Sequence, residues 1–299
     1  MQSGPSIDLH THSTASDGTF SPAALVHEAS ACGVRVLALT DHDTIHGIEE
    51  ALKAARACGI SLIPGVEIDV DSRSVEGAPP GETHILGLGL KNPSAALLQE
   101  MARLEQARQE RGRHIIERMR ERGWPASYEE LAALAGTGII GRPHVAAYLV
   151  KLKKARTIQC AFDLYLARGK DLHIPKESAP LALALAVIKE SGGMAVLAHP
   201  ASLYVSWSRL PLILAGLAEA GLDGIEAWHP MSTRHVCERM EKLGRSLGLC
   251  ISAGSDFHGE KRHDRCLGRS AGGQRIPLSI LEEIPALHAY LPKVPHALG

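Results

Sequence analysis

Two pairs of residues with metal-binding side chains stand near opposite ends of this 299-residue chain. His10 and His12 follow one short apolar run, and Asp256 and His258 follow another. In an extended strand, side chains two residues apart project to the same face, so both members of a pair can reach one site. Imidazole and carboxylate groups are common ligands of divalent metal ions. The spacing therefore predicts a metal site to which both ends of the chain contribute.

Histidine or glutamate also stands at or beside an end of the other short apolar runs. These residues are His42, Glu67, His84, His199 and His229, and Asp17 lies in the loop after His12. One histidine in such a place is usually structural, but coincidence on seven separate runs is a poor explanation. We therefore interpret the set as a metal centre where several segments meet.

The ligand types narrow the choice of metal and of reaction. They are imidazoles and carboxylates without cysteine, which favours manganese, zinc or iron over copper(I) or an iron–sulfur cluster. A set of this size has too many groups for one ion, so two or three clustered ions bridged by a carboxylate fit better. Such clusters suit phosphoryl transfer, because they bind phosphate oxygens, lower the pKa of a bridging water and neutralise charge on the leaving oxygen.

The apolar runs are expected to be strands that alternate with helices. The predicted strands are 7–9, 34–39, 60–63, 84–90, 194–198, 224–228 and 249–252. The predicted helices between them are 21–33, 44–58, 179–191, 210–220 and 232–247. This alternation indicates α/β architecture with a parallel sheet, and seven strands favour a TIM-like barrel, whose active site lies at the C-terminal ends of the strands.

The alternation stops between about residues 93 and 179, where helical patterns cover 97–122, 129–135, 144–153 and 158–168. We predict a helical insertion, or cap, at 97–178 in a barrel domain made of 1–96 and 179–299. The alternative is a set of ordinary barrel helices with one unrecognised strand. The charged run 106–122 is expected to be a solvated helix face, with nucleic-acid contact as the alternative.

Composition excludes several classes of function. Lys and Arg number 32 and Asp and Glu number 33, so a net charge of −1 argues against binding of long nucleic acid or an anionic membrane. No apolar run reaches the roughly 18 residues of a membrane helix, and the first residues do not resemble a signal peptide, so we expect a cytoplasmic protein. Six cysteines without a CxxC pair do not indicate a disulfide framework. The oligomeric state is left open.

Six segments resemble the motifs of the PHP (polymerase and histidinol phosphatase) family: DLHTHSTASDG, LTDHDT, PGVEI, THILGLG, VLAHP and GSDFH. They are spread over both ends of the chain. Within the family, the chain looks most like the nucleotide phosphatases and short-RNA exonucleases with a helical insertion, and particularly like the 3′,5′-nucleoside bisphosphate phosphatases. The resemblance implies a distorted seven-stranded (β/α) barrel that holds three divalent ions, commonly Mn²⁺, with Zn²⁺ or Fe²⁺ as alternatives.

The resemblance also implies a ligand set for each ion. The first ion would be held by His10, His12, Glu67 and Asp256. Glu67 would bridge to a second ion, which His84 and His199 complete. The third ion would be held by Asp17, His42 and His258. All nine ligand positions of the family are present in this chain.

The function implied is a metal-dependent phosphoesterase. It would hydrolyse a phosphate monoester of a small nucleotide, converting a 3′,5′-bisphosphonucleoside to the nucleoside 5′-monophosphate, and AMP is a further candidate. Hydroxide that bridges two ions would attack phosphorus in line. The alternatives are a 5′→3′ exonuclease on short oligoribonucleotides and a histidinol-phosphatase-like enzyme.

Two further classes are disfavoured. A metal-stabilised binding module without activity would be favoured by a missing bridging carboxylate, but Glu67 is present. A metal-dependent C–N hydrolase often uses a carboxylated lysine as the bridge, and no lysine stands at a predicted strand end.

Four residues are candidates for contact with the substrate. Arg142 and His144, in a Gly-Arg-Pro-His segment of the insertion, could bind phosphate, although the segment also reads as a helix start. Lys176 could contact the substrate or be a surface lysine. His229 could donate a hydrogen bond to phosphate, protonate the leaving group, or support a ligand.

Other residues near the candidate ligands and the substrate pocket are assigned less specific roles. Asp41, Asp43 and His46 are expected to support the ligands or form turns rather than to bind metal. The Gly- and Pro-rich loop 71–82 looks long for the family, which affects the substrate pocket rather than the metals. Tyr204, Trp207 and Trp228 are the nearest candidates for stacking on a base, and the sequence does not rank them.

Overall fold

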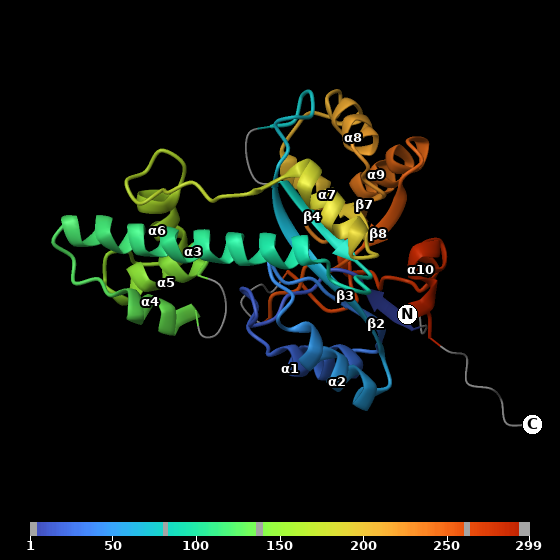
Figure 1. Ribbon diagram of the computed structural model, residues 1–299, viewed down its shortest axis with the longest axis horizontal. Helices are drawn as coiled ribbons and strands as arrows, with labels where there is room; N and C mark the ends of the chain where they lie inside the picture. The colour runs from blue at the N-terminus through green and yellow to red at the C-terminus, as the bar shows by residue number, and fades with distance from the viewer. Residues whose placement is uncertain (1–4, 80–82, 136–139, 260–263, 293–299) are drawn as a thin grey trace, which may run out of the picture.

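The computed structural model of the chain describes residues 5–79, 83–135, 140–259 and 264–292. Within these residues the fold is mixed α/β, with eight strands in one sheet (Figure 1). Seven strands form a path in the order β1–β2–β3–β4–β6–β7–β8, and the short β5 pairs with β3. The strands are β1 (Ser6–Asp8), β2 (Val34–Leu39), β3 (Ser61–Asp71), β4 (Thr83–Leu88), β5 (Ala179–Pro180), β6 (Met194–Leu197), β7 (Gly224–Trp228) and β8 (Cys250–Ala253). The seven predicted strands are present, and β5 was not predicted.

Strand β4 corrects the expectation of an all-parallel sheet, because it runs antiparallel to both β3 and β6. Parallel neighbours need a crossover of a dozen or more residues, usually a helix, and the connection 72–82 is too short for one. The reversal places the first residues of β4 at the edge where its neighbours end. His84 therefore lies opposite Asp69 of β3, although it stands at the start of its strand.

Strand β3 is longer than predicted and belongs to two halves of the sheet. Its residues 61–64 pair with β2, and its residues 65–70 pair with β4. Beyond the end of β2, backbone hydrogen bonds from Asp43 N–H to Glu67 O and from Glu67 N–H to Asp41 O continue the contact. Glu67 thus lies within a strand rather than at the strand end expected from the sequence.

The predicted barrel is not closed by strand pairing among the described residues, where β1 and β8 stand at the two ends of the path. Segments that follow these two strands are nevertheless joined. Leu9 N–H donates to Ala253 O (3.2 Å), Asp256 N–H to His10 O (2.9 Å) and His12 N–H to Phe257 O (2.9 Å). These hydrogen bonds bring the two residue pairs from opposite ends of the chain side by side.

The helices around the sheet agree with the predicted ones to within a few residues. They are α1 (Pro22–Ala31), α2 (Ile48–Cys58), α7 (Leu181–Glu190), α8 (Leu210–Glu219) and α9 (Arg234–Ser246). Helix α1 begins where expected, because the Ser21 side chain accepts a hydrogen bond from Ala24 N–H. Helix α2 ends at Gly59, whose φ of 67° is left-handed.

Two short helices near the C-terminal end, α10 (Ser279–Glu282) and a 3₁₀ helix at Pro285–Tyr290, were not predicted. Their side chains Leu281, Ile284 and Leu287 join the apolar cluster that Ile7 and Val36 of the sheet also belong to. They complete the core on one side of the sheet. No helix that the structure describes has the length and apolarity needed to cross a membrane.

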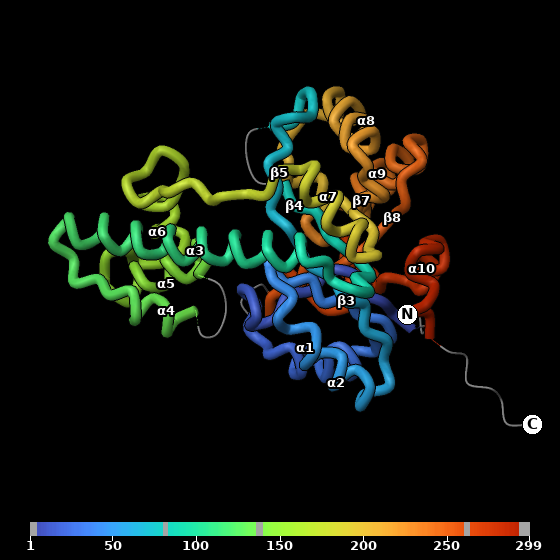
Figure 2. The backbone as a smooth tube through the Cα atoms, in the orientation of Figure 1, coloured from blue at the N-terminus to red at the C-terminus, as the bar shows by residue number. Residues whose placement is uncertain are grey.

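The segment after β4 is helical, as predicted. It contains α3 (Ala95–Glu121), α4 (Tyr128–Ala135), α5 (Arg142–Lys151), α6 (Ile158–Ala161) and a π-helical turn, η1 (Phe162–Leu166). The long α3 runs from the sheet to a group made by α4, α5 and α6, and the chain returns through a long irregular segment (Figures 1 and 2). This group shares an apolar cluster with the C-terminal part of α3, with Ile115 of α3 and Leu131, Tyr148 and Leu149 of the group fully or almost fully buried. The described residues of 97–178 include no strand, and the short β5 begins directly after them.

Candidate metal centre and substrate pocket

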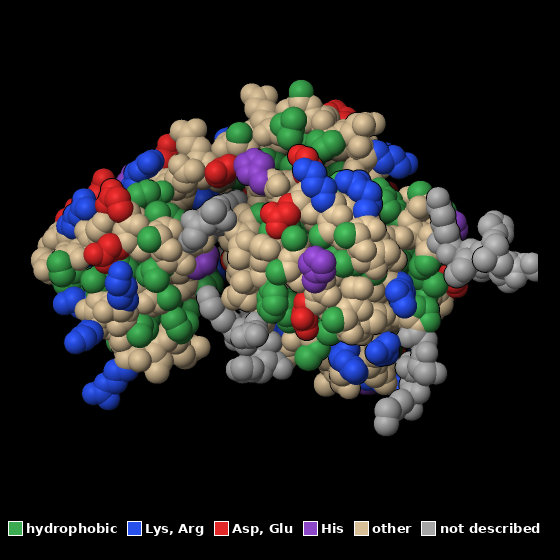
Figure 3. All heavy atoms as spheres, turned by 90° about the horizontal axis from the view of Figure 1, so that it is seen from below, with side chains coloured by type: hydrophobic (Ala, Val, Ile, Leu, Met, Phe, Trp, Pro, Cys, Tyr) green, Lys and Arg blue, Asp and Glu red, His purple; other side chains and the backbone are tan. Residues whose placement is uncertain are grey.

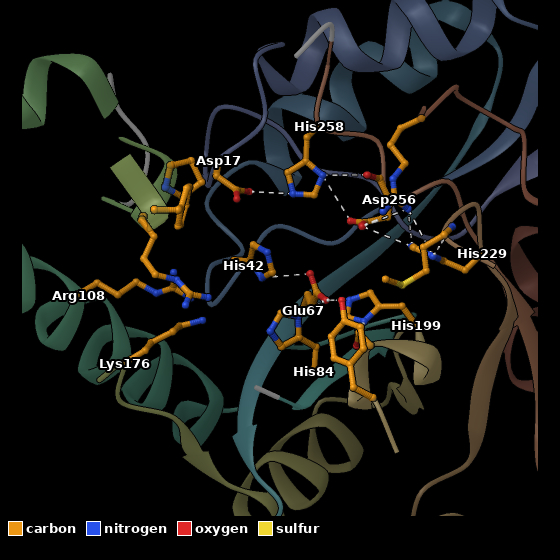
Figure 4. A pocket seen from close by; sticks show the side chains of 18 of the residues that line it. Asp17, His42, Glu67, His84, Arg108, Lys176, His199, His229, Asp256 and His258 are labelled. Carbon is orange, nitrogen blue, oxygen red and sulfur yellow. Dashed lines mark hydrogen bonds and ion pairs between the residues drawn. The ribbon is translucent and has the colours of Figure 1, made fainter. Parts of the chain in front are cut away.

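The structure brings the nine predicted ligands into one cluster. Figure 4 shows those that line the cavity above it, namely Asp17, His42, Glu67, His84, His199, Asp256 and His258. The nine ligands come from both ends of the chain and from the edge of the sheet at which β4 begins. They are His10 and His12 after β1, Asp17 in the next loop, His42 after β2, Glu67 in β3, His84 in β4, His199 after β6, and Asp256 and His258 after β8.

Glu67 is the centre of this cluster, and its carboxylate is fully buried. Five imidazoles surround it. Its Oε2 lies 3.3, 3.2 and 3.1 Å from His10 Nε2, His12 Nε2 and His42 Nδ1, and its Oε1 lies 2.7 and 3.1 Å from His84 Nδ1 and His199 Nε2. One carboxylate that faces two sets of imidazoles has the position expected of a bridging ligand.

Two aspartates extend the cluster on one side. Asp256 Oδ1 lies 3.3 Å from His12 Nε2 and 3.4 Å from His258 Nδ1. His258 Nε2 lies 3.2 Å from Asp17 Oδ1. The ligand atoms of His12, Asp17, His42 and His258 all lie within 4.8 Å of one another, as do those of two smaller groups around Glu67.

The donor set fits divalent metal ions. His12 Nδ1, His42 Nδ1, His84 Nε2 and Glu67 Oε2 are buried without a hydrogen bond of acceptable geometry. Buried polar atoms are normally paired, and an unpaired one is costly. Imidazole nitrogens and carboxylate oxygens that converge in this way would gain their missing partners from cations such as Mn²⁺, Zn²⁺ or Fe²⁺.

The carboxylates control the protonation of the cluster. Burial would lower the pKa of His12, but its contacts with Asp256 and Glu67 outweigh burial and raise that pKa to about 10. The pKa of His10 is raised well above its ordinary value in the same way, against burial, by Glu226, Glu67 and Asp256. Burial dominates at His42 and lowers its pKa well below the ordinary value. Without metal, protons on some of these imidazoles therefore balance the buried carboxylates.

Two buried carboxylates support the ligands and were not singled out from the sequence. Glu226 in β7 lies 3.1 Å from His10 Nδ1 and accepts a hydrogen bond from His199 N–H (2.8 Å). Asp8 accepts hydrogen bonds from Ser255 N–H (2.9 Å), the Ser255 hydroxyl (2.6 Å) and Gly268 N–H (2.8 Å). Such contacts fix the orientation of metal ligands. Glu226 could have been recognised in the sequence, because it is a carboxylate inside the apolar run 224–228.

Asp41 and Asp43 support neighbouring segments, as expected. Asp41 accepts hydrogen bonds from Ser13 and Ser16, which hold the loop that carries Asp17. Asp43 accepts from Asp69 N–H (3.0 Å). His46 donates its backbone N–H to Thr44 and lies in a turn.

A cavity of about 390 Å³ opens over the cluster, and basic side chains line its other side. They are Arg108 and Arg111 of α3, Arg142 of α5, and Lys176. In Figure 4, Arg108 and Lys176 lie across the cavity from His199 and His229. The surface is hollowed between the helical group and the larger part of the molecule (Figure 3). The cavity therefore has a floor of candidate metal ligands, named the metal-binding floor below, and a cationic wall.

The interpretation of 106–122 as a solvated helix face is wrong for the part of α3 that belongs to the cationic wall. Arg108 and Arg111 are each only 7% exposed, and the Arg108 guanidinium contacts the Asp43 carboxylate. Helix α3 is 27 residues long and passes the cavity on its way to the helical group, so one of its faces is covered there. Its other face, with Gln109 and Glu110, is exposed as expected.

The four predicted substrate contacts occupy different places. Arg142 and Lys176 line the cavity, and the Lys176 ammonium contacts Asp69, so Lys176 is not a simple surface lysine. His144 is buried, and its Nδ1 accepts Gly141 N–H (3.1 Å), which caps the start of α5. Its imidazole is not among the described side chains that line the cavity.

His229 lies beside the cluster together with Arg265, which sequence reasoning missed. His229 Nε2 is 3.4 Å from Asp256 Oδ2 and 2.8 Å from Arg265 Nη1. Arg265 is 6% exposed and lines the cavity. No motif surrounds Arg265 in the sequence.

The loop 71–82 does not line the cavity with any of its described residues. Val75 of this loop packs into the core near α8 instead. Residues 80–82 lie outside the described part of the chain.

Comparison with known proteins adds independent findings. Residues 8–170 match the PHP domain family. The chain is 38% identical over 253 residues to the 5′-3′ exoribonuclease Rnm of Salmonella typhimurium, with 84% of each chain covered. It is 31% identical over 285 residues to the 3′,5′-nucleoside bisphosphate phosphatase of Chromobacterium violaceum, with 94% of this chain and 96% of that protein covered.

Two solved structures have similar folds over almost their whole length. An amidohydrolase from Chromobacterium violaceum with bound sulfate and no metal has a TM-score of 0.79 at 29% identity, with 92% of this chain and 94% of that chain covered. A metal-dependent phosphoesterase from Bifidobacterium adolescentis has a TM-score of 0.78 at 28% identity, with 94% and 95% covered.

The central position of Glu67 leads to a test of metal binding. Glu67→Gln removes the charge that five imidazoles share, so we expect it to weaken Mn²⁺ binding at least about tenfold and to abolish the Mn²⁺-dependent rise in melting temperature. Metal content after dialysis and thermal unfolding measure both effects. Asp71→Asn, in the same strand but paired with the exposed Arg73, is the control. An unchanged Mn²⁺-dependent shift in Glu67→Gln would rule out the central role.

The raised pKa values of His10 and His12 lead to a pH prediction. These groups hold protons at neutral pH in the metal-free chain, and a metal ligand must be a neutral imidazole. Binding therefore releases protons, and the affinity for Mn²⁺ should increase from about pH 6 to about pH 9. Calorimetric titration in two buffers with different ionisation enthalpies measures the release. Equal observed enthalpies in both buffers would contradict it.

Proposed function

The chain belongs to the PHP domain family and is a metal-dependent phosphoesterase, and we propose that it hydrolyses the 3′-phosphate of nucleoside 3′,5′-bisphosphates to leave the 5′-monophosphate. The observation that carries this proposal is the pairing of the metal-binding floor with the cationic wall in one cavity. The floor suits the phosphate that is cleaved. The wall of Arg108, Arg111, Arg142 and Lys176 suits a second anionic group, here the 5′-phosphate.

The proposed cofactors are three divalent ions, Mn²⁺ in the first place. His10, His12, Glu67 and Asp256 would hold one, Glu67 with His84 and His199 the second, and Asp17, His42 and His258 the third. Ions held there supply the charge that binds phosphate oxygens and lowers the pKa of water. The convergence of the nine side chains and their unpaired buried atoms support this assignment.

Two residues of the chain are proposed to act on the phosphate directly. The Arg265 guanidinium lines the cavity beside Asp256, where it can donate hydrogen bonds to phosphoryl oxygens as their charge increases. His229, 2.8 Å from Arg265, is placed to donate a proton to the leaving 3′-oxygen. Arg142 and Lys176 bind the second anion, and His144 holds the backbone that carries Arg142.

The proposed architecture is a distorted barrel made by the seven strands of the sheet path, residues 1–96 and 179–299, with an inserted helical cap at 97–178. The separate apolar cluster of the helical group supports this division. The cap supplies the cationic wall through α3 and α5. Substrates would be small nucleotides or short RNA, and the net charge of −1 disfavours long nucleic acid.

A second candidate is 5′→3′ exonuclease activity on short oligoribonucleotides, which the 38% identity to an exoribonuclease favours. The 5′-terminal nucleotide of a phosphorylated RNA carries a 5′-phosphate and a 3′-phosphodiester. It therefore differs from a nucleoside 3′,5′-bisphosphate in one ester bond on the phosphate that is cleaved. The same cationic wall could select both substrates through the 5′-phosphate.

Phosphate release by the Mn²⁺-loaded protein tests the proposal. The substrates are adenosine 3′,5′-bisphosphate, AMP, histidinol phosphate and a short 5′-phosphorylated RNA. We expect the highest kcat/KM with the bisphosphate, and a loss of at least about a hundredfold in Asp256→Ala because a ligand of the cluster is removed. Asp163→Ala, on the exposed surface of the helical group, is the control. Turnover of RNA alone would make the exonuclease the function, and turnover of none would refute both.

A substitution of Arg142 tests whether the cationic wall binds the 5′-phosphate. Arg142→Gln should raise KM about tenfold or more for adenosine 3′,5′-bisphosphate, because a hydrogen bond to a charged group contributes roughly 1.5–3 kcal/mol. It should leave KM for adenosine 3′-phosphate, which lacks the second anion, unchanged. Lys151→Gln, at the exposed other end of α5, is the matched control. Equal effects on both substrates would mean that Arg142 does not recognise the 5′-phosphate.

A further inference from the structure

One aromatic side chain stands out at the cavity. Tyr204 follows the 3₁₀ helix η2 (Pro200–Leu203), lines the cavity and is 85% exposed. Its backbone is left-handed, with φ of 50°. A non-glycine residue in this region is under strain, and strain of this kind is concentrated at functional sites. Because the Tyr204 ring lies beside the cavity and is not packed in the core, it is available to contact a ligand there.

The neighbouring residues hold Tyr204 in this position. Leu203 is buried in the core, and Val205 packs against the same cluster. The turn is tied to the metal centre through His199, whose N–H donates to Glu226 and whose Nδ1 lies 2.8 Å from Ser202 Oγ. The two residues that flank Tyr204 thus face inward, and the tyrosine ring is directed away from the core.

The other candidate aromatics are already occupied. Trp228 Nε1–H donates to Glu241 Oε2 (2.7 Å), and its ring packs against the core. The Trp207 ring packs on the core and is covered by the Arg239 guanidinium, 4.0 Å from its centroid. Neither ring is among the described side chains that line the cavity. The structure therefore ranks Tyr204 first of the three.

Apolar groups accompany Tyr204 at the cavity. Met231 is 41% exposed and lines it from the segment after β7, and Phe162 lines it from the helical group. Tyr204 and Met231 are the two largely exposed large apolar side chains of the described chain that line the cavity. The cavity thus combines two anion-binding surfaces with apolar faces, a combination that matches a phosphorylated molecule with a flat ring.

We infer that Tyr204 is the base-binding residue of this cavity and that its ring stacks on the nucleobase of the substrate, with Met231 beside it. The inference rests on the proposed function and deepens it. His199 belongs to the metal cluster and lies in the same turn, so the phosphate and the base would be held by one rigid segment. Stacking on an aromatic ring accepts any base, because every base has a π-face.

Binding of a product to the Mn²⁺-loaded full chain tests this inference without turnover. Calorimetry compares AMP with ribose 5-phosphate, which lacks the base. The wild type should bind AMP about fivefold to a hundredfold more tightly. Tyr204→Ala should reduce AMP binding to the level of ribose 5-phosphate and leave ribose 5-phosphate binding unchanged, while Tyr204→Phe retains the preference. In turnover, Tyr204→Ala should raise KM for the bisphosphate with little change in kcat.

Leu212→Ala, exposed on α8 outside the cavity lining, is the control. Equal wild-type affinity for the two ligands, absent binding of both, or equal loss of both in Tyr204→Ala would overturn the inference. Phosphate release from adenosine 3′,5′-bisphosphate by the same preparation separates the two proposals. Release without a preference for AMP refutes the base site alone, and a Tyr204-dependent preference without release refutes the proposed reaction alone.

Discussion

A carboxylate buried at the centre of a protein must be neutralised, and the arrangement around Glu67 follows from that requirement. The Glu67 side chain is fully buried, and an isolated charge in such a place would be prohibitively costly. Five imidazoles from separate segments lie within 3.3 Å of its oxygens. Protons on these imidazoles, or metal ions among them, supply the balancing charge. The segments after β1, β2 and β6 and the start of β4 must therefore meet at this point.

The same requirement explains the layers of support behind the ligands. Glu226 orients His10 and fixes the backbone of His199, and Asp41 ties down the loop that carries Asp17. On the other side of the cavity, arginine and lysine side chains balance the buried carboxylates in place of imidazoles. Asp43 and Asp69 are buried there and are balanced by Arg108 and Lys176, which also line the cavity. The basic side chains of the wall thus stabilise the fold and leave cationic groups facing the space where an anion would bind.

The predictable part of this structure is the part encoded by residue type and short-range spacing. The pairs His10–His12 and Asp256–His258, and the apolar runs beside the other ligands, were sufficient to predict seven of the eight strands and the convergence of the ligands. The helical patterns between the runs predicted the helices around the sheet but not α10. The reversed β4 was not predicted, because strand direction depends on the length of a connection and not on the strand's own residues. Arg265 was missed because it meets His229 across 36 positions of sequence without a local pattern. Arg108 and Arg111 were misread because a charged helix face looks solvated until the tertiary packing covers it.

Backbone strain is concentrated where these charges meet. The described chain has five non-glycine residues with positive φ, and Asp43, His199, Tyr204 and Asp256 are four of them. Each such residue costs about 1–3 kcal/mol, so the surrounding contacts must offset that cost. The Asp256 N–H donates to His10 O, and its carboxylate faces His12, so the electrostatic attraction that assembles the cluster also holds its backbone in the strained form. Tyr204 differs from the other three, because its side chain gains no such contact in the free protein. The strain at Tyr204 is offset through Leu203 and His199 on the same turn, and these contacts fix the backbone from which the exposed ring projects.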